Sequence, residues 1–302
     1  SDHLAAVAEG EYEVCVDSTL VPGHLTYGEC VLPGETPDEI LISIHSCHPS
    51  LANDNLSGMV VGTFLARELL AGPRRHTIRF LFIPGTIGSI TWLARNAALT
   101  KHIRHGLVLS CLGDPGPSTY KRSRRGNAVV DRAAAHVIKN AGPHSLLDFV
   151  PYGYDERQYC SPGFDLPVGS LTRTPNGRFP EYHTSADNLA FVTPEALADS
   201  LEKCLRIVEI LEHDGAYLNL NPYCEPQLGR RGLYRATGGR DLPGFELALL
   251  WVLNLSDGRH TLLDIAERST VPFRVILKAA KALEGVDLLA GVPGLPGTEA
   301  AS

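Results

Sequence analysis

The chain has 302 residues, of which 44% are hydrophobic, so it is long and apolar enough to fold around a substantial core rather than remain disordered. Its formal net charge of -7 argues against general nucleic-acid binding, and no apolar stretch approaches the roughly 20 residues that a membrane-spanning helix needs. Seven cysteines are scattered without a CxxC pair, and no basic-then-apolar leader opens the chain, which predicts free thiols in a soluble, cytoplasmic protein.

The beginning of the chain is expected to contribute to a small β-rich element. The stretch EYEVCVDSTLVPGHLTYGECVLPG, residues 11–34, alternates in short β-like runs that Pro-Gly and Gly interrupt. Because this part reads as the middle of a domain, we expect the natural protein to have sequence before residue 1.

Strands and helices then alternate as far as residue 218. An apolar, β-branched run at 39–46 predicts a strand buried on both faces, and residues 55–72 follow helical periodicity up to a closing glycine. The later elements continue this alternation, with strands expected at 76–84, 105–114 and 166–174, and helices at 88–99, 128–142 and 193–215. This order predicts an α/β sandwich with a mainly parallel sheet.

The composition changes after residue 218. A Pro-, Gly- and Arg-rich stretch at 219–244 predicts a linker, and three helical segments and a short apolar run follow it. Three helices and a hairpin match a winged helix, so we expect a linker and winged-helix domain over 219–302. Its third helix has few basic residues for phosphate binding, so docking or homo-oligomerisation is a better expectation for this domain than binding nucleic acid.

Two separate stretches place metal-binding side chains beyond the predicted sheet. HSCHPSLANDNLSG, residues 45–58, puts His48 and Asp54 between a strand and a helix, where ligands of open α/β sheets bind. PEYHTSADN, residues 180–188, puts His183 on the loop before the long helix. Alone, Asp54 fits a helix cap and His48 a solvated turn, but imidazole and carboxylate together are ordinary zinc ligands.

Five motifs in fixed order support a family resemblance over nearly the whole chain. They are CHPSLANDNLSG, PGTIGSITWLARN, YKRSRRGNA, DERQYCSPG and EYHTSADN. Together they resemble a bacterial family of aminopeptidase-like proteins of polysaccharide biosynthesis, within the zinc aminopeptidase superfamily. The resemblance implies that residues 1–35 are part of an inserted β domain, that 36–218 form an aminopeptidase-like α/β domain, and that a winged helix ends the chain.

The resemblance also implies a ligand set for zinc, with one ion per chain expected rather than two. The family pattern matches Asp54, His183 and, through its CHPS motif, His48. His45 is the reserve for the early histidine, because the superfamily's His-x-Asp pattern would begin there. Asp114 is the reserve for an aspartate at a second metal.

The superfamily has a Glu-Glu pair that supplies a general base and a metal ligand, but this chain has Gly85 and Thr86 at that place. A carboxylate near a metal can accept a proton from water, so Glu156 is the expected base and Asp155 the alternative. Either can also be a metal ligand. Arg157 is expected to polarise a carbonyl or hold a substrate carboxylate.

A basic cluster and a tyrosine complete the predicted site. Four basic residues follow the third predicted strand, either as an exposed loop or as a pocket for an anionic substrate group, and are Lys121, Arg122, Arg124 and Arg125. Tyr182, beside His183, is expected to contact substrate.

The sequence thus predicts a zinc-dependent, aminopeptidase-type hydrolase that cleaves a peptide or amide bond of a small amino-acyl substrate in biosynthesis. A scaffold that keeps the fold without catalysis is one alternative, favoured by the missing Glu-Glu pair. A winged-helix regulator whose α/β domain senses a ligand is another.

Overall fold

The computed structural model describes residues 7–233 and 244–292. Residues 1–6 of the predicted β element, 234–243 of the predicted linker and 293–302 of the predicted winged-helix domain lie outside the described residues. Among the described residues, no helix combines the length and apolar character needed to cross a membrane.

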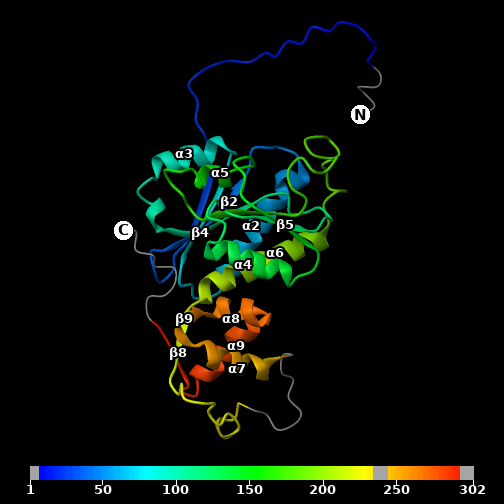
Figure 1. Cartoon of the computed structure of the whole chain (residues 1–302). Helices are drawn as coiled ribbons and strands as arrows, with labels where there is room; N and C mark the ends of the chain where they lie inside the picture. Colours follow the sequence, from blue (N-terminus) through cyan, green and yellow to red (C-terminus); the bar gives the residue numbers. More distant parts are fainter. Residues whose placement is uncertain (1–6, 234–243, 293–302) are drawn as a thin grey trace.

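A seven-stranded sheet forms the centre of the larger unit (Figure 1). Its strands, in chain order, are β1 (Gly28–Leu32), β2 (Glu39–His45), β3 (Thr77–Ile83), β4 (Ile103–Leu109), β5 (Ser118–Lys121), β6 (His144–Leu147) and β7 (Val168–Thr172). Their order across the sheet is β1-β3-β2-β4-β7-β5-β6. The β1–β3 and β5–β7 pairs are antiparallel and the other neighbours are parallel, which confirms the predicted mainly parallel sheet.

The central strand β2 shows why the apolar run folds this way. Ile40, Ile42 and Ile44 point into one hydrophobic cluster, whereas Leu41 points into the cluster on the opposite face. Successive strand residues face opposite sides, so a continuous apolar run is buried only where helices cover both faces. All seven residues of β2 are buried, as predicted.

Helices cover both faces of the sheet (Figure 1). One face packs against α2 (Gly58–Leu69), α4 (Val129–Lys139) and α6 (Pro194–His213), and the other against α3 (Ile87–Arg95) and the short α5 (Glu156–Tyr159). The start of α6 follows the predicted signals, because the Thr193 hydroxyl accepts a hydrogen bond from the Ala196 N–H and Pro194 occupies the first turn. Shorter turns are η1 (Ala52–Ser57), η2 (Thr100–His102) and η3 (Gly229–Arg231).

The C-terminal unit is a winged helix, as predicted. It contains α7 (Phe245–Leu255), α8 (Leu262–Ser269) and α9 (Phe273–Glu284), with a small sheet of β8 (Ala216–Asn219), β9 (Asp257–Thr261) and β10 (Leu289–Gly291). Figure 1 shows these helices against α4 and α6, and one hydrophobic cluster continues from the α/β domain into them. Arg132 of α4 forms an ion pair with Asp264 of α8 at 2.6 Å, which adds a polar contact to this junction.

The structure also contains elements that the sequence pattern did not indicate. β5 and β6 extend the sheet beyond β7. Of the predicted β-like stretch 11–34, only Gly28–Leu32 forms a strand, β1, and it joins the other edge of the central sheet by pairing with β3. The predicted helix at 55–72 is divided, because η1 carries the chain from β2 to the start of α2 with non-helical backbone at Asp54 and Asn55. That irregular turn determines where the Asp54 side chain lies.

Candidate metal centre

The three predicted metal ligands meet at the carboxyl edge of the sheet. β2 ends at His45, and the turn that follows it contains His48 and Asp54, whereas His183 lies on the loop between β7 and α6. Potential ligand atoms of His48, Asp54 and His183 all lie within 4.8 Å of one another. Residues 129 positions apart in the sequence therefore form one cluster.

Distances within the cluster suit a metal ion. The Asp54 Oδ2 atom lies 3.1 Å from the His183 Nε2 atom and 3.6 Å from the His48 Nδ1 atom. Zinc bonds of about 2.0–2.2 Å place the corners of a tetrahedron about 3.3–3.6 Å apart. Moreover, the His48 Nδ1 atom is buried without a hydrogen-bond partner among the described residues, so it is available as a ligand. The donor set and its spacing fit zinc.

Exposure differs among the three side chains. That of Asp54 is fully buried, that of His48 is 23% exposed and that of His183 is 48% exposed. The cluster therefore has a closed side at Asp54 and an open side at His183. Three protein ligands with one accessible direction are the arrangement of catalytic rather than structural zinc sites.

His45 orients the carboxylate of Asp54. The amide nitrogen of Asn55 lies 3.3 Å from His45 Nδ1, so this ring nitrogen accepts and the opposite Nε2–H donates to Asp54 Oδ1 at 2.7 Å. The other oxygen of Asp54 is left to face His48 and His183. His45 also forms a second close group with Cys47 and His48, although both of its ring nitrogens already take part in hydrogen bonds.

The pKa values of Asp54 and His45 both lie below their ordinary values. Burial, the largest influence on Asp54, raises its pKa, but the hydrogen bond from His45 and the nearby histidine charges outweigh burial and hold the pKa below its ordinary value. Burial lowers the pKa of His45 despite the Asp54 carboxylate. An ionised Asp54 and a neutral His45 are thus favoured at neutral pH, and ligands bind metals in their deprotonated forms.

Asp187 is a supporting residue that the sequence analysis missed. Its buried carboxylate accepts hydrogen bonds from the backbone N–H groups of Asn53 at 2.6 Å and Asp54 at 3.0 Å. It lies four residues after His183 in the same EYHTSADN motif, which was the available signal. One loop therefore supplies a candidate ligand and fixes the turn that carries another.

The reserve residue Asp114 lies near this turn but serves other contacts. Its carboxylate accepts hydrogen bonds from the Asn53 amide at 3.1 Å, the Thr174 hydroxyl at 2.6 Å and the Gly116 N–H. Among the described residues it belongs to no close group of potential metal ligands. Its observed role is to join three loops.

The DERQ segment, residues 155–158, lies at the start of the one-turn helix α5. The Glu156 carboxylate forms an ion pair with Lys121 and accepts hydrogen bonds from the Tyr154 N–H. Asp155 is fully buried and accepts a hydrogen bond from the Ser89 hydroxyl at 2.7 Å, and Arg157 has a buried Nε without a partner. No hydrogen bond or ion pair in the described ranges joins these three residues to His48, Asp54 or His183.

Tyr154 fills the place where the superfamily's Glu-Glu pair is expected. A side chain at Gly85 would collide with the Tyr154 ring. That ring lies 3.9 Å from the ring of His45, and its hydroxyl is 2.9 Å from the Cys47 sulfur. The position therefore has an aromatic wall instead of a carboxylate.

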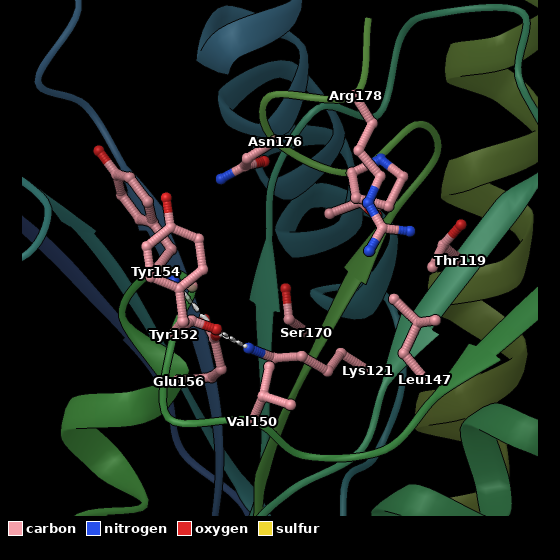
Figure 2. Close-up of a pocket in the computed structure, with 13 residues that line it drawn as sticks. Thr119, Lys121, Leu147, Val150, Tyr152, Tyr154, Glu156, Ser170, Asn176 and Arg178 are labelled. Atoms are coloured by element: carbon pink, nitrogen blue, oxygen red, sulfur yellow. Dashed lines mark hydrogen bonds and ion pairs between the residues drawn. The ribbon is translucent and has the colours of Figure 1, made fainter.

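The basic cluster is largely neutralised by ion pairs. Arg122 pairs with Asp148, and both Arg124 and Arg125 pair with Asp165 on the surface. The prediction of an anion pocket made by all four basic residues is therefore not supported for the arginines, because carboxylates distant in sequence already occupy them. Lys121 differs, since it lines a pocket beside Tyr154 and Glu156 (Figure 2).

Tyr182 lies against a candidate ligand. Its ring stacks on that of His183 with centroids 3.9 Å apart and an interplanar angle of 14°. Burial raises the pKa of Tyr182 to about 12, and the Asp54 charge contributes in the same direction. The stacked phenol limits the orientations of the His183 ring at the open side of the cluster.

Asp155 should give the protein a measurable pH dependence of stability. Burial, reinforced by the charge of Glu156 and opposed by the Ser89 hydrogen bond, raises its pKa from 3.8 to about 7. The folded state therefore retains a proton that the unfolded chain releases, so this stabilisation is full below about pH 4 and disappears as pH rises through about 7. Asp155→Asn should make the free energy of unfolding fall less steeply over that range.

Urea unfolding at several pH values measures this effect. Burial raises the pKa of Asp214 to about 6, so the free energy of unfolding also declines with pH through this residue, equally in the parent and in Asp155→Asn. Identical pH profiles for the parent and Asp155→Asn would show that Asp155 ionises normally in the fold.

Comparisons with known proteins match two segments of the chain to family models. A family model described as a domain of unknown function, DUF4910, matches residues 10–214, and a winged helix-turn-helix model matches 215–291. A Clostridium acetobutylicum protein named "Putative polysaccharide biosynthesis protein with aminopeptidase-like domain" is 50% identical over 285 residues, 94% of this chain and 65% of that protein. This chain thus spans less than two thirds of the length of that relative.

Solved structures agree on the fold. The structure of a "putative peptidase" from Clostridium acetobutylicum has a TM-score of 0.82 and 48% identity, over 88% of this chain and 60% of that one. BSAP, a zinc aminopeptidase from Bacillus subtilis, has a TM-score of 0.53 and 20% identity, over 61% of this chain and 49% of that one. An aminopeptidase from Aneurinibacillus sp. strain AM-1 has a TM-score of 0.52 and 19% identity, covering 61% and 47%. The α/β domain therefore has the aminopeptidase-like fold.

Proposed function

Since the chain belongs to the DUF4910 family, we propose that it is a zinc-dependent hydrolase that cleaves a peptide or amide bond of a small amino-acyl substrate. The observation that supports this most directly is the cluster of His48, Asp54 and His183, with one closed and one accessible side. The name of the 50% identical relative favours a role in polysaccharide biosynthesis.

Under this proposal, His48, Asp54 and His183 hold one zinc ion and His45 orients Asp54. Zinc, when bound, supplies Lewis acidity that polarises a carbonyl and makes water more acidic. Tyr154 lies against the ring of His45 and Tyr182 stacks on the ring of His183, so aromatic rings border the cluster at both histidines.

Two carboxyl groups remain candidates for the base. Glu156 lines the pocket, where it forms an ion pair with Lys121. Asp155 has a pKa of about 7, a value suited to proton exchange near neutral pH, and one of its oxygens is buried without a partner in the described part of the chain. We propose Glu156 as the base and Asp155 as the second choice, with Arg157 contributing positive charge to the carbonyl.

Metal-dependent turnover tests this function. A panel of amino-acyl amides should be hydrolysed by the zinc-loaded full chain, and chelation should reduce the rate by at least about 100-fold, with recovery on adding zinc. The His183→Ala variant should remain inactive after zinc is added. Hydrolysis that is unchanged by chelation would contradict the proposal.

A catalytically silent scaffold is the second candidate, and Gly85 with its covering Tyr154 is the observation that favours it. In that case, zinc would bind without turnover of any amide in the panel. The regulator alternative has less support, because the start of α9 faces the protein: the Phe273 N–H donates to His136 and Arg274 pairs with Glu209. The end that a recognition helix would present to DNA is thus occupied.

The remaining proposals concern the cellular compartment and the binding partners of the protein. All seven cysteines are free thiols, in keeping with the cytoplasm as the proposed compartment. The proposed partners are a small peptide or amino-acyl substrate and, through the winged helix, a second copy of the chain.

A further inference from the structure

The pocket beside the metal-ligand cluster has a polar floor. β5 and β7 run antiparallel, with Thr119 opposite Thr172 and Lys121 opposite Ser170. Because side chains alternate along a strand, these four share one face while Tyr120 between them is buried in the core. All four line the pocket, whose cavity volume of about 160 Å³ admits a small ligand (Figure 2).

Several hydrogen-bonding groups in this pocket are unused. The Arg178 side chain forms no hydrogen bond or ion pair with any described residue, and Figure 2 shows its guanidinium pointing into the pocket between Ser170 and Thr119. The hydroxyls of Thr119 and Ser170 likewise have no partner within the described ranges, although both residues are largely buried. A cation and two hydroxyls therefore face the same space.

The charge balance of the pocket favours an anion. Lys121 is matched by Glu156, so their charges cancel and Arg178 leaves an excess of one positive charge. A guanidinium presents a planar set of donors that matches the two oxygens of a carboxylate. Thr119 and Ser170 can each donate one further hydrogen bond to such a group.

Two lining residues connect this pocket to the metal-ligand cluster. Tyr154 lines the pocket and contacts the ring of His45. Asn176 accepts a hydrogen bond from the Cys111 thiol, and the Cys111 N–H donates to Asn55 beside Asp54. Arg178 itself lies five residues before His183 on the same loop. The pocket and the metal-ligand cluster therefore share neighbouring residues.

We propose that the substrate carries a carboxylate group, which Arg178, Thr119 and Ser170 bind while the amide to be cleaved lies at His48, Asp54 and His183. This inference rests on the proposed function, because it takes the pocket as the part of the site that holds substrate. The substrate class is thus an acidic amino-acyl amide or peptide.

Ligand binding without turnover tests this inference separately from hydrolysis. Calorimetry on the full chain kept metal-free with a chelator should compare N-acetyl-L-glutamic acid α-amide with N-acetyl-L-glutamine amide, which differ only in carboxylate versus amide. We expect the acid to bind at least tenfold more tightly. Arg178→Gln should remove this preference, and Thr119→Val should reduce it. Arg268→Gln, which changes an exposed arginine of the winged helix, should retain it.

Three results would overturn the inference. Equal binding of the two ligands, or a preference for the acid that survives Arg178→Gln, would show that these residues do not select for a carboxylate. Tighter binding of N-acetyl-O-phospho-L-serine amide would assign the pocket to phosphate instead. A carboxylate preference together with absence of hydrolysis would leave this pocket assignment intact and count against the proposed hydrolase alone.

Discussion

Asp54→Asn is expected to weaken zinc binding by more than about 100-fold, beyond the roughly 10- to 100-fold losses that residues supporting a metal ligand produce. The substitution removes the negative charge that lies between the two histidine nitrogens, 3.1 and 3.6 Å away, but keeps the size of the side chain. Zinc affinity is measured by competition with a chromogenic chelator, and amide hydrolysis should decrease in parallel.

The matched control is Asp148→Asn, which changes an exposed carboxylate paired with Arg122. It should leave zinc affinity within about twofold of the parent, since exposed ion pairs contribute little. Equal affinities in Asp54→Asn and the parent would exclude Asp54 as a ligand, and the His45, Cys47 and His48 group would become the better candidate.

Asp187→Ala is expected to lower the free energy of unfolding by about 2–4 kcal/mol, because two backbone N–H groups would lose a buried charged acceptor. Those N–H groups belong to Asn53 and Asp54, so the same change should weaken zinc binding by about 10- to 100-fold. Urea unfolding with chelator present measures the first effect without any contribution from metal.

Glu181→Ala, on the same loop, is the control for Asp187→Ala, because its side chain forms no hydrogen bond or ion pair with a described residue. It should leave both stability and zinc affinity nearly unchanged. If Asp187→Ala lost stability but kept the parent's zinc affinity, Asp187 would support the loop without positioning Asp54.

Much of the fold could be predicted because its central strands are continuous apolar runs. β2, β3 and β4 are buried on both faces, so the run itself is the signal. β5 has four residues and alternates polar Thr119 and Lys121 with buried Tyr120, so it lacks such a run. Its place in the sheet depends on pairing with β7, about 50 residues later, which no local pattern reveals.

Residues of the candidate site could be predicted from the sequence only where they lie in a recognisable motif. His48, Asp54 and His183 lie in quoted motifs at the ends of predicted elements. In contrast, the partners of Arg122, Arg124 and Arg125 lie 26 to 41 residues away, so their neutralisation required the structure. The position of Tyr154 over Gly85 and that of Arg178 in the pocket also depend on contacts between distant loops. The residues adjacent to them in sequence do not indicate these positions.

The central claim is that His48, Asp54 and His183 hold one metal ion. The most direct test is elemental analysis of the full chain purified without added metal, beside His48→Ala and His183→Ala. We expect about one zinc per chain in the parent and loss of zinc from both variants. A parent chain that contains no metal and takes up none on addition of zinc would contradict the claim and leave the scaffold as the better description.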